Sequence, residues 1–246
     1  MELGEIQGLV DIHTHILHGV DDGAKDLQDA LALLRLAREN GTTQLVLTPH
    51  YRGHWRSNTP RLLRERFAEL SEQAAKELPD VKLYLGNEAG IEREVGEKVA
   101  EGRILPVGDS RYVLLEFDYN SSRIQVINGV MEVISSGFMP IIAHAERYDI
   151  FRKDKQLPDE ILHVGAMIQL NADSVMGYCG LRAKLCCLRL LSRGQVHFIA
   201  SDGHDLKCRK PVLRDCFAYV AKRFGEEYAW VLFRDQAKAI LSGQRR

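Results

Sequence analysis

Short apolar runs alternate with longer amphipathic segments along most of the chain. Seven runs have the length of buried strands: Gly8–Asp11, Gln44–Leu47, Val81–Leu85, Tyr112–Leu115, Pro140–Ala143, Ala166–Leu170 and Val196–Ala200. Helical spacing predicts a helix capped by Asp26 and ending near Asn40, and further helices over Pro60–Leu78, Ile124–Ser136, Leu181–Leu191, Pro211–Phe224 and Glu226–Leu241. Repeated strand, helix, strand units of this length predict an α/β fold with a parallel sheet.

Nearly every predicted strand is followed directly by a side chain that can bind a metal ion. In chain order these side chains are His13 and His15, His50, Glu88, Glu116, His144, Asn171, and Asp202 with His204. A closed parallel β/α barrel brings the carboxyl ends of all its strands to one face. The sequence therefore predicts that these residues meet in a single site.

Length and composition agree with one β/α domain over residues 1–246. The 33 basic and 34 acidic side chains nearly balance, so strong binding to nucleic acid is not expected. No apolar stretch is long enough to span a membrane, so membrane insertion is not expected either. Five cysteines lack paired CxxC spacing and are interpreted as reduced thiols of a cytoplasmic protein: Cys179, Cys186, Cys187, Cys208 and Cys216.

The sequence DIHTH at Asp11–His15 is the first candidate metal motif. Residues two apart in an extended strand point the same way, so both histidines can reach one ion. Taken singly, the other polar positions have ordinary explanations: Asp21 and Asp22 as turn formers, His50 as a core histidine. Glu116 is harder to explain, because an unpaired carboxylate after a strongly apolar strand would be costly to bury.

The joint pattern exceeds the four ligands of one tetrahedral ion and favours two or three metal ions. Manganese, iron and zinc all suit mixed nitrogen and oxygen ligation. Such a cluster can activate a water and hold the oxygens of a phosphate during its displacement.

The motifs in this order resemble the polymerase and histidinol phosphatase (PHP) superfamily. DIHTHILHGVDDG, DSRYVLLEF, PIIAHAERY and IASDGHDLKCR more closely resemble the bacterial capsular and exopolysaccharide protein-tyrosine phosphatases. The resemblance implies a distorted seven-stranded (β/α)7 TIM-like barrel, a manganese-preferring trinuclear site and hydrolysis of phosphotyrosine in proteins. The implied metal ligands are His13, His15, Asp22, His50, Glu88, Glu116, His144, Asp202 and His204, and the implied phosphate-binding residues are Arg147 and Arg209.

By the same resemblance, the substrate is expected to be the tyrosine-rich tail of a bacterial tyrosine autokinase that controls polysaccharide export. Asn87 departs from the small residue expected before Glu88. The basic, aromatic loop Tyr51–Arg56 is either a flank for the incoming phosphotyrosine or a solvated loop. His50, His54 and Asp205 all stay open as the group that protonates the leaving phenolate.

Cysteine-based tyrosine phosphatases carry a CxxxxxR loop, and two segments match that spacing, beginning at Cys187 and Cys208. Such a loop must present consecutive backbone N–H groups to phosphate. The first segment is a leucine-rich helical stretch, and the second contains Pro211, which lacks an N–H. Both matches are therefore interpreted as coincidences, and a metal-bound hydroxide is the expected nucleophile.

Other functions stay open from the sequence. The substrate can instead be histidinol phosphate or another small phosphomonoester, since the loops around the site decide the leaving group. Metal-dependent amidohydrolases also begin with HxH, but they usually carry a bridging lysine where this chain has Glu116. A nuclease lacks support because no basic face is evident. A non-catalytic, metal-binding regulatory module is the alternative outside enzymes, and no motif indicates the oligomeric state.

Overall fold

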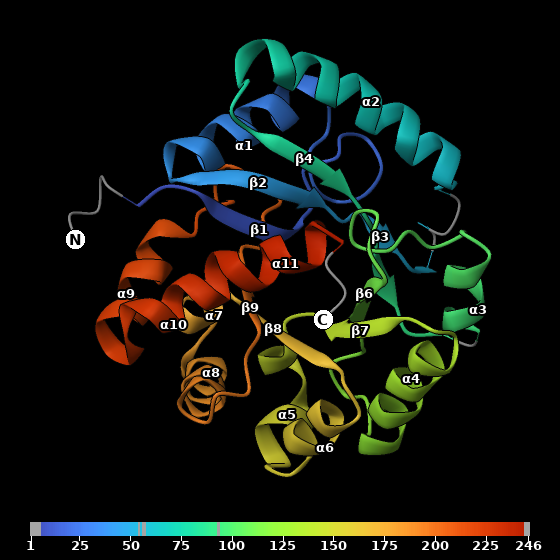
Figure 1. Ribbon diagram of the computed structural model, residues 1–246, viewed down its shortest axis with the longest axis vertical. Helices are drawn as coiled ribbons and strands as arrows, with labels where there is room; N and C mark the ends of the chain where they lie inside the picture. Colours follow the sequence, from blue (N-terminus) through green and yellow to red (C-terminus); the bar gives the residue numbers. More distant parts are fainter. Residues whose placement is uncertain (1–5, 54, 56–57, 93, 244–246) are drawn as a thin grey trace.

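The computed structural model describes residues 6–53, 55, 58–92 and 94–243. Its strand segments are β1 (Leu9–Thr14), β2 (Thr42–Leu47), β3 (His50–Tyr51), β4 (Lys82–Leu85), β5 (Glu88–Gly90), β6 (Tyr112–Glu116), β7 (Met139–Ile142), β8 (Met167–Asn171) and β9 (Phe198–Ala200). All their pairings are parallel, in the orders β1-β2-β4 and β3-β5-β6-β7-β8-β9. Figure 1 shows these strands curling around a centre with helices outside them.

The nine strand segments follow the seven predicted apolar runs, because two runs are interrupted rather than ended. Thr48 and Pro49 separate β2 from β3, and Gly86 and Asn87 separate β4 from β5. The Asn87 side chain holds the second break: its amide donates to the Pro49 carbonyl at 2.9 Å and its oxygen accepts from the Leu105 N–H at 2.9 Å. Asn87, which stands where the resemblance led us to expect a small residue, therefore links neighbouring strand segments through its side chain.

The first and last strands close the ring just beyond their carboxyl ends. Thr14 forms an isolated parallel bridge with Gly203. The His15 N–H donates to the Gly203 carbonyl at 2.8 Å, and the Asp202 N–H donates to the His13 carbonyl at 3.0 Å. The seven-stranded α/β barrel expected from the sequence is confirmed as a curled parallel sheet, distorted at these irregular junctions.

The helices are α1 (Leu27–Glu39), α2 (Pro60–Glu77), α3 (Val95–Ala100), α4 (Arg123–Ser135), α5 (Asp149–Lys153), α6 (Leu157–His163), α7 (Ala172–Met176), α8 (Leu181–Ser192), α9 (Arg214–Phe224), α10 (Glu226–Trp230) and α11 (Gln236–Leu241). A 3₁₀ turn, η3, covers Ala145–Arg147, and a π-helical segment, η4 (Val231–Asp235), joins α10 to α11. Asp26 caps α1 as predicted, accepting from two backbone N–H groups.

One helix start differs from the prediction: α9 begins at Arg214, not at Pro211. Pro211 packs against the loop at Gly203, where an added Cβ would lie 2.8 Å from the proline Cα. Residues 211–213 therefore precede the helix instead of forming its first turn.

The barrel interior is filled by apolar side chains, including Val10, Ile12, Leu114 and Ile141, together with Ile240 of α11. α11 therefore covers the amino-terminal mouth of the barrel, and Figure 1 shows it crossing the ring of strands. The carboxyl-terminal mouth is left for the polar residues. No helix among the described residues has both the length and the apolar character needed to cross a bilayer.

Candidate metal centre

His13 and His15 face each other at the end of β1. Their Nε2 atoms lie 3.2 Å apart, and both side chains are fully buried. Each ring is oriented through its other nitrogen: Nδ1 of His13 lies 3.1 Å from Oε1 of Gln169, and Nδ1 of His15 lies 2.7 Å from Oδ2 of Asp21. A carboxylate or amide oxygen on Nδ1 fixes the tautomer that leaves Nε2 available to a metal ion. Both Nε2 atoms are therefore prepared as ligands.

Glu88 lies at the centre of the site and contacts four histidines. Its Oε1 is 2.8 Å from Nε2 of His144 and 3.4 Å from Nε2 of His13. Its Oε2 is 2.8 Å from Nδ1 of His50 and 3.3 Å from Nε2 of His15. Burial alone would raise the pKa of this carboxyl, but the imidazoles of His13 and His50 hold it well below its usual range. Glu88 is therefore a carboxylate able to bridge neighbouring cations.

Asp22, His50 and His204 form the outer part of the site. Oδ1 of Asp22 is 3.5 Å from Nε2 of His50 and 3.4 Å from Nε2 of His204. Hydrogen bonding from His204, and then from His50, lowers the pKa of the Asp22 carboxyl. For His50, burial would lower the pKa of the imidazole, but the Glu88 carboxylate outweighs it and raises that pKa to about 9. These three side chains thus converge on one small volume.

His144 and Asp202 both have left-handed backbone conformations, with φ of 33° and 55°. Non-glycine residues adopt this region infrequently, and such strain concentrates at functional sites. Here it turns both side chains from the ends of β7 and β9 into the barrel mouth. Oδ1 of Asp202 lies 3.4 Å from Nε2 of His15, and the nearby histidines overcome burial to lower the pKa of Asp202 to about 2.

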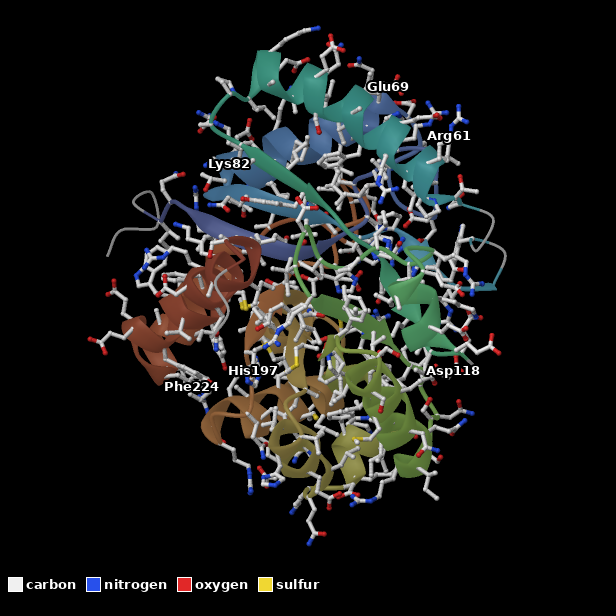
Figure 2. All side chains as sticks on the ribbon, turned by 45° about the vertical axis from the view of Figure 1, so that its right-hand side comes forward. Arg61, Glu69, Lys82, Asp118, His197 and Phe224 are labelled. Atoms are coloured by element: carbon white, nitrogen blue, oxygen red, sulfur yellow. The ribbon has the colours of Figure 1, made fainter. Side chains whose placement is uncertain are left out.

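Glu116 ends β6 at the edge of the same cluster, with its Oε2 3.7 Å from Nδ1 of His50. This carboxylate, which would be costly to bury unpaired, has a cationic partner in the chain: Nη1 of Arg52 lies 2.7 Å from the same oxygen. Arg52 also donates to Asp118, which Figure 2 labels, at 2.8 Å.

The donor atoms fit a multinuclear metal centre. The potential ligands form three groups, and within each group one donor atom of every residue lies within 4.8 Å of the others. The groups are His15, Asp22, His50 and His204; His13, His15 and Glu88; and His50, Glu88 and Glu116. Consecutive groups share a residue, as the centres of a metal cluster would. Several buried atoms here have charged neighbours but no well-aligned hydrogen bond among the described residues, namely Nδ1 of His50, Nε2 of His204 and Oε2 of both Glu88 and Glu116. Buried polar atoms without partners are costly, and coordinated cations would satisfy them.

Both predicted arginines lie at the rim of this centre. Nη1 of Arg147 donates to Oδ2 of Asp202 at 3.1 Å, and the guanidinium carbon lies 5.3 Å from the centre of the Tyr119 ring. Nη2 of Arg209 donates to Oδ2 of Asp22, also at 3.1 Å. The two side chains are 31% and 40% exposed, so each contacts the site and solvent together.

The structure also identifies supporting residues that the sequence did not single out. Gln169 accepts from the His144 N–H at 2.8 Å while contacting His13. The Tyr148 hydroxyl lies 3.1 Å from Nδ1 of His144 and accepts from the Phe117 N–H at 3.0 Å. Asp21, interpreted from the sequence only as a turn former, orients His15. In the sequence, these residues can be noticed only as polar residues close to the predicted strand ends. Their hydrogen-bond partners are distant in the sequence, so the sequence does not indicate what they contact.

The loop after β3 is described only in part, since His54 and Arg56 lie outside the described residues. Trp55 stacks on His50, with ring centres 4.8 Å apart and planes 17° apart. Asp205 accepts from two backbone N–H groups, those of Lys207 and Cys208, both at 2.6 Å. Burial opposes these bonds, but they lower the pKa of the Asp205 carboxyl. Asp205 therefore shapes the loop that carries Arg209 and is poorly suited to donate a proton.

The cysteines do not form a phosphate-binding loop. Cys187 is buried within α8, and burial raises the pKa of its thiol well above the usual value. Cys208 is exposed, and its N–H is occupied by Asp205. Neither has the ring of free backbone N–H groups that a cysteine-based phosphatase requires.

A family model described as "Capsular polysaccharide synthesis, CpsB/CapC" matches residues 9–242. Two relatives are similar over nearly their whole lengths. The tyrosine-protein phosphatase YwqE of Bacillus subtilis (strain 168) is 31% identical over 96% of this chain and 92% of its own. The tyrosine-protein phosphatase CpsB of Streptococcus pneumoniae is 31% identical over 96% of this chain and 99% of its own.

A solved structure gives the same result for the fold. It comes from crystal structures of YwqE from Bacillus subtilis and CpsB from Streptococcus pneumoniae, described as unique metal-dependent tyrosine phosphatases. It superposes with a TM-score of 0.90 and 30% identity, covering 96% of both chains. The barrel, the strand-end residues and the relatives thus agree with one another.

Proposed function

The chain belongs to the capsular polysaccharide synthesis CpsB/CapC family, and we propose that it removes phosphate from phosphotyrosine in a protein substrate at the centre described above. The chain is a metal-dependent tyrosine phosphatase, and the proposal concerns its substrate and the residues that act on it. The observation that carries the finer proposal is the meeting of three overlapping histidine and carboxylate groups with two arginines at their rim.

We assign metal ligation to His13, His15, Asp22, His50, Glu88, Glu116, His144, Asp202 and His204. The mixture of imidazole and carboxylate donors supports two or three divalent ions, with manganese as the predicted metal and iron or zinc as alternatives. When bound, such ions supply Lewis-acid charge for phosphate oxygens and lower the pKa of water. The chain's own residues supply orientation: Asp21 and Gln169 fix the histidines, and Glu88 holds the groups together.

Arg147 and Arg209 are the proposed phosphate-binding residues. Each guanidinium is anchored to a carboxylate of the site and partly exposed to solvent, so remaining N–H groups can donate to phosphoryl oxygens. Two fixed positive charges on opposite carboxylates would offset the charge that develops as the ester bond breaks. The phenolate leaving group needs only modest protonation. Of the groups that stayed open for that role, Asp205 is disfavoured by its lowered pKa.

A protein substrate is favoured by the surroundings of His204. A hollow of about 300 Å³ next to this residue is lined by Leu206, by two lysines and by two aspartates, Lys25, Lys207, Asp29 and Asp205. Leu206 is 46% exposed, so the hollow offers an apolar surface among balanced charges. This surface suits the aromatic ring of a tyrosine side chain. We propose the tail of a bacterial tyrosine kinase as the substrate; that assignment and the cytoplasmic location stay predictions.

The test is phosphate release from a phosphotyrosine peptide and, in parallel, from histidinol phosphate. Each substrate is measured with added manganese and again after chelation. We expect manganese-dependent turnover of the peptide. Turnover of histidinol phosphate alone would keep the metal centre but replace the substrate, and no turnover of either substrate by the metal-loaded protein would favour the regulatory module.

Glu116→Ala tests the ligand assignment, because it removes one proposed ligand at the edge of the site. The ion-pair partner Arg52 keeps a second carboxylate, that of Asp118, so the variant is expected to fold. It should abolish turnover while the protein stays folded. Full activity of this variant at equal metal content would contradict the ligand assignment.

A further inference from the structure

A strongly basic hollow of about 470 Å³ lies between α5 and α8, outside the metal centre. Five of the side chains that line it are basic and one is acidic: Arg152, Lys153, Lys155, Arg182 and Arg189, with Asp149. Figure 1 shows α5 and α8 as neighbours on one side of the barrel. The concentration of one charge sign in a concave surface indicates an anion-binding site.

The single carboxylate does not neutralise these cations. Asp149 is shared between Arg152, which donates to its Oδ1, and Lys153, whose Nζ lies 3.1 Å from its Oδ2. Within the described ranges, no ion pair is formed by Lys155 or Arg182. Five positive charges therefore face one negative charge, which leaves a surplus that an anion would offset.

Two of the cations are held rigidly in place. Nη1 of Arg152 donates to the carbonyl of Arg147 at 2.9 Å and to that of Glu146 at 3.2 Å. Nη2 of Arg189 donates to the Phe151 carbonyl. Nη1 of Arg189 is buried and has no hydrogen-bond partner among the residues that the structure describes. A buried guanidinium N–H without an acceptor is costly, so a turn of this side chain toward the hollow that brings the N–H to a phosphate oxygen is favoured.

An apolar rim adjoins this charge. Leu185 lines the hollow and is 57% exposed. Leu181, one helical turn earlier on the same face of α8, is 68% exposed. Isolated exposed leucines are ordinary, but two on one helix face beside unpaired cations are suited to a ligand that is both aromatic and anionic.

The hollow is also within reach of the metal centre. Arg147 and Arg152 are five residues apart, with the extended residue Tyr148 between η3 and α5, so their Cα atoms lie at most about 17 Å apart. The Arg152 guanidinium itself reaches back to the Arg147 carbonyl at 2.9 Å. An extended peptide advances about 3.3 Å per residue. With the lengths of its side chains added, two phosphotyrosines roughly three to six residues apart on one peptide can reach the metal centre and the hollow together.

We propose that this hollow binds a second phosphotyrosine of the same substrate chain while the first occupies the metal centre. The inference rests on the proposed function. The second phosphate is bound by the basic side chains, and its ring packs against the α8 leucines. Because binding of the second group becomes intramolecular, a substrate with two phosphotyrosines is held more tightly than one with a single phosphotyrosine.

The experiment uses the full chain with manganese and peptides that carry one phosphotyrosine. A non-hydrolysable phosphonomethyl-phenylalanine is placed two, four, six or eight residues away, and phenylalanine replaces it in the matched peptides. At the best spacing we expect KM to fall by about tenfold with unchanged kcat. In Lys155→Ala/Arg182→Ala, both substitutions being at exposed side chains, this advantage disappears while the phenylalanine peptides react as with the wild type.

The matched control is Arg64→Ala/Lys82→Ala, which removes the same charge from the end of the molecule that carries α2 and β4. Figure 2 labels Lys82, which lies at the opposite end of the molecule from α5 and α8. This control should keep the full KM advantage. Loss of the advantage in the control as well would show a general charge effect and overturn the proposal.

Three further results would also overturn the proposal: no KM advantage at any spacing, an advantage that persists in Lys155→Ala/Arg182→Ala, and an equal advantage from glutamate at the second position. Failure of the proposed function gives a different result, because then the singly phosphorylated peptides do not react at all. In that case fluorescence anisotropy of a labelled phosphonate peptide still tests the hollow. Equal binding by the wild type and the Lys155→Ala/Arg182→Ala variant would overturn it.

Discussion

Asp21 is predicted to control metal affinity without being a ligand, and Asp21→Asn tests this. Its buried carboxylate accepts three hydrogen bonds: Oδ2 from Nδ1 of His15 at 2.7 Å and from the His50 N–H at 3.1 Å, and Oδ1 from the Gly23 N–H at 3.0 Å. Asparagine has the same shape, but an NH2 group replaces one of the oxygens. Both oxygens of Asp21 accept hydrogen bonds, so in either orientation of the amide the NH2 group faces another hydrogen-bond donor.

The consequence is largest if the NH2 group faces His15. Nδ1 of His15 must then accept, and the proton moves to Nε2, the atom that faces His13 and Glu88. A protonated Nε2 cannot bind a metal ion. Loss of the oxygen that orients a ligating histidine typically weakens metal binding about 10- to 100-fold. That corresponds to about 1.4 to 2.8 kcal/mol of binding free energy.

Manganese affinity is measured by competition with a chromophoric chelator, and phosphatase activity at limiting and at saturating manganese. We expect weaker binding and an activity that excess metal largely restores. Asp80→Asn makes the same chemical change at an exposed ion pair with Arg38, and it should match the wild type. Wild-type affinity in Asp21→Asn would refute the reasoning, and so would unchanged affinity with a lost kcat, since Asp21 would then act on the reaction itself.

Four further predictions follow from the same geometry. His144→Ala should lower turnover by at least about 100-fold and reduce bound metal, measured by elemental analysis, because Glu88 loses one of its two contacts at 2.8 Å. Cys187→Ala and Cys208→Ala should each keep wild-type kcat; a large loss in either, with folding and metal content intact, would indicate a cysteine nucleophile. Arg147→Lys should lower kcat/KM by roughly 10- to 100-fold with metal content unchanged, because lysine lacks the planar fork, and unchanged kinetics would remove Arg147 from phosphate binding. Gly23→Ala should lower both the melting temperature and the manganese affinity, since the new Cβ would lie 1.8 Å from the His15 carbonyl oxygen; a wild-type melting curve by circular dichroism would contradict this.

The alternation of strands and helices was predictable because each element is encoded locally. Asp26 carries its own capping signal, and the apolar runs have the short length and the β-branched content that are typical of buried strands. The interruptions at Pro49 and Asn87 were not predictable to the same degree. They depend on hydrogen bonds between residues 38 and 18 positions apart, and no local pattern reports such partners.

The positions of the candidate ligands were also readable, since a parallel barrel requires that strand ends share one face. The roles within the cluster were not. Glu88 and Glu116 both follow strands, yet only the folded chain puts Glu88 against four histidines and Glu116 against Arg52. Asp21 and Asp22 are adjacent in sequence, but the turn directs one toward the back of His15 and the other toward His204.

The sequence by itself therefore determined which residue types stand at the barrel mouth, and with them the chemistry available there. Tertiary structure alone decided which nitrogen of each histidine faces the site, which carboxylate is central, and that α5 and α8 combine their cations into one hollow. The reason is physical: strand and helix propensities act over a few residues, whereas hydrogen bonds, ion pairs and close packing join residues by distance in space.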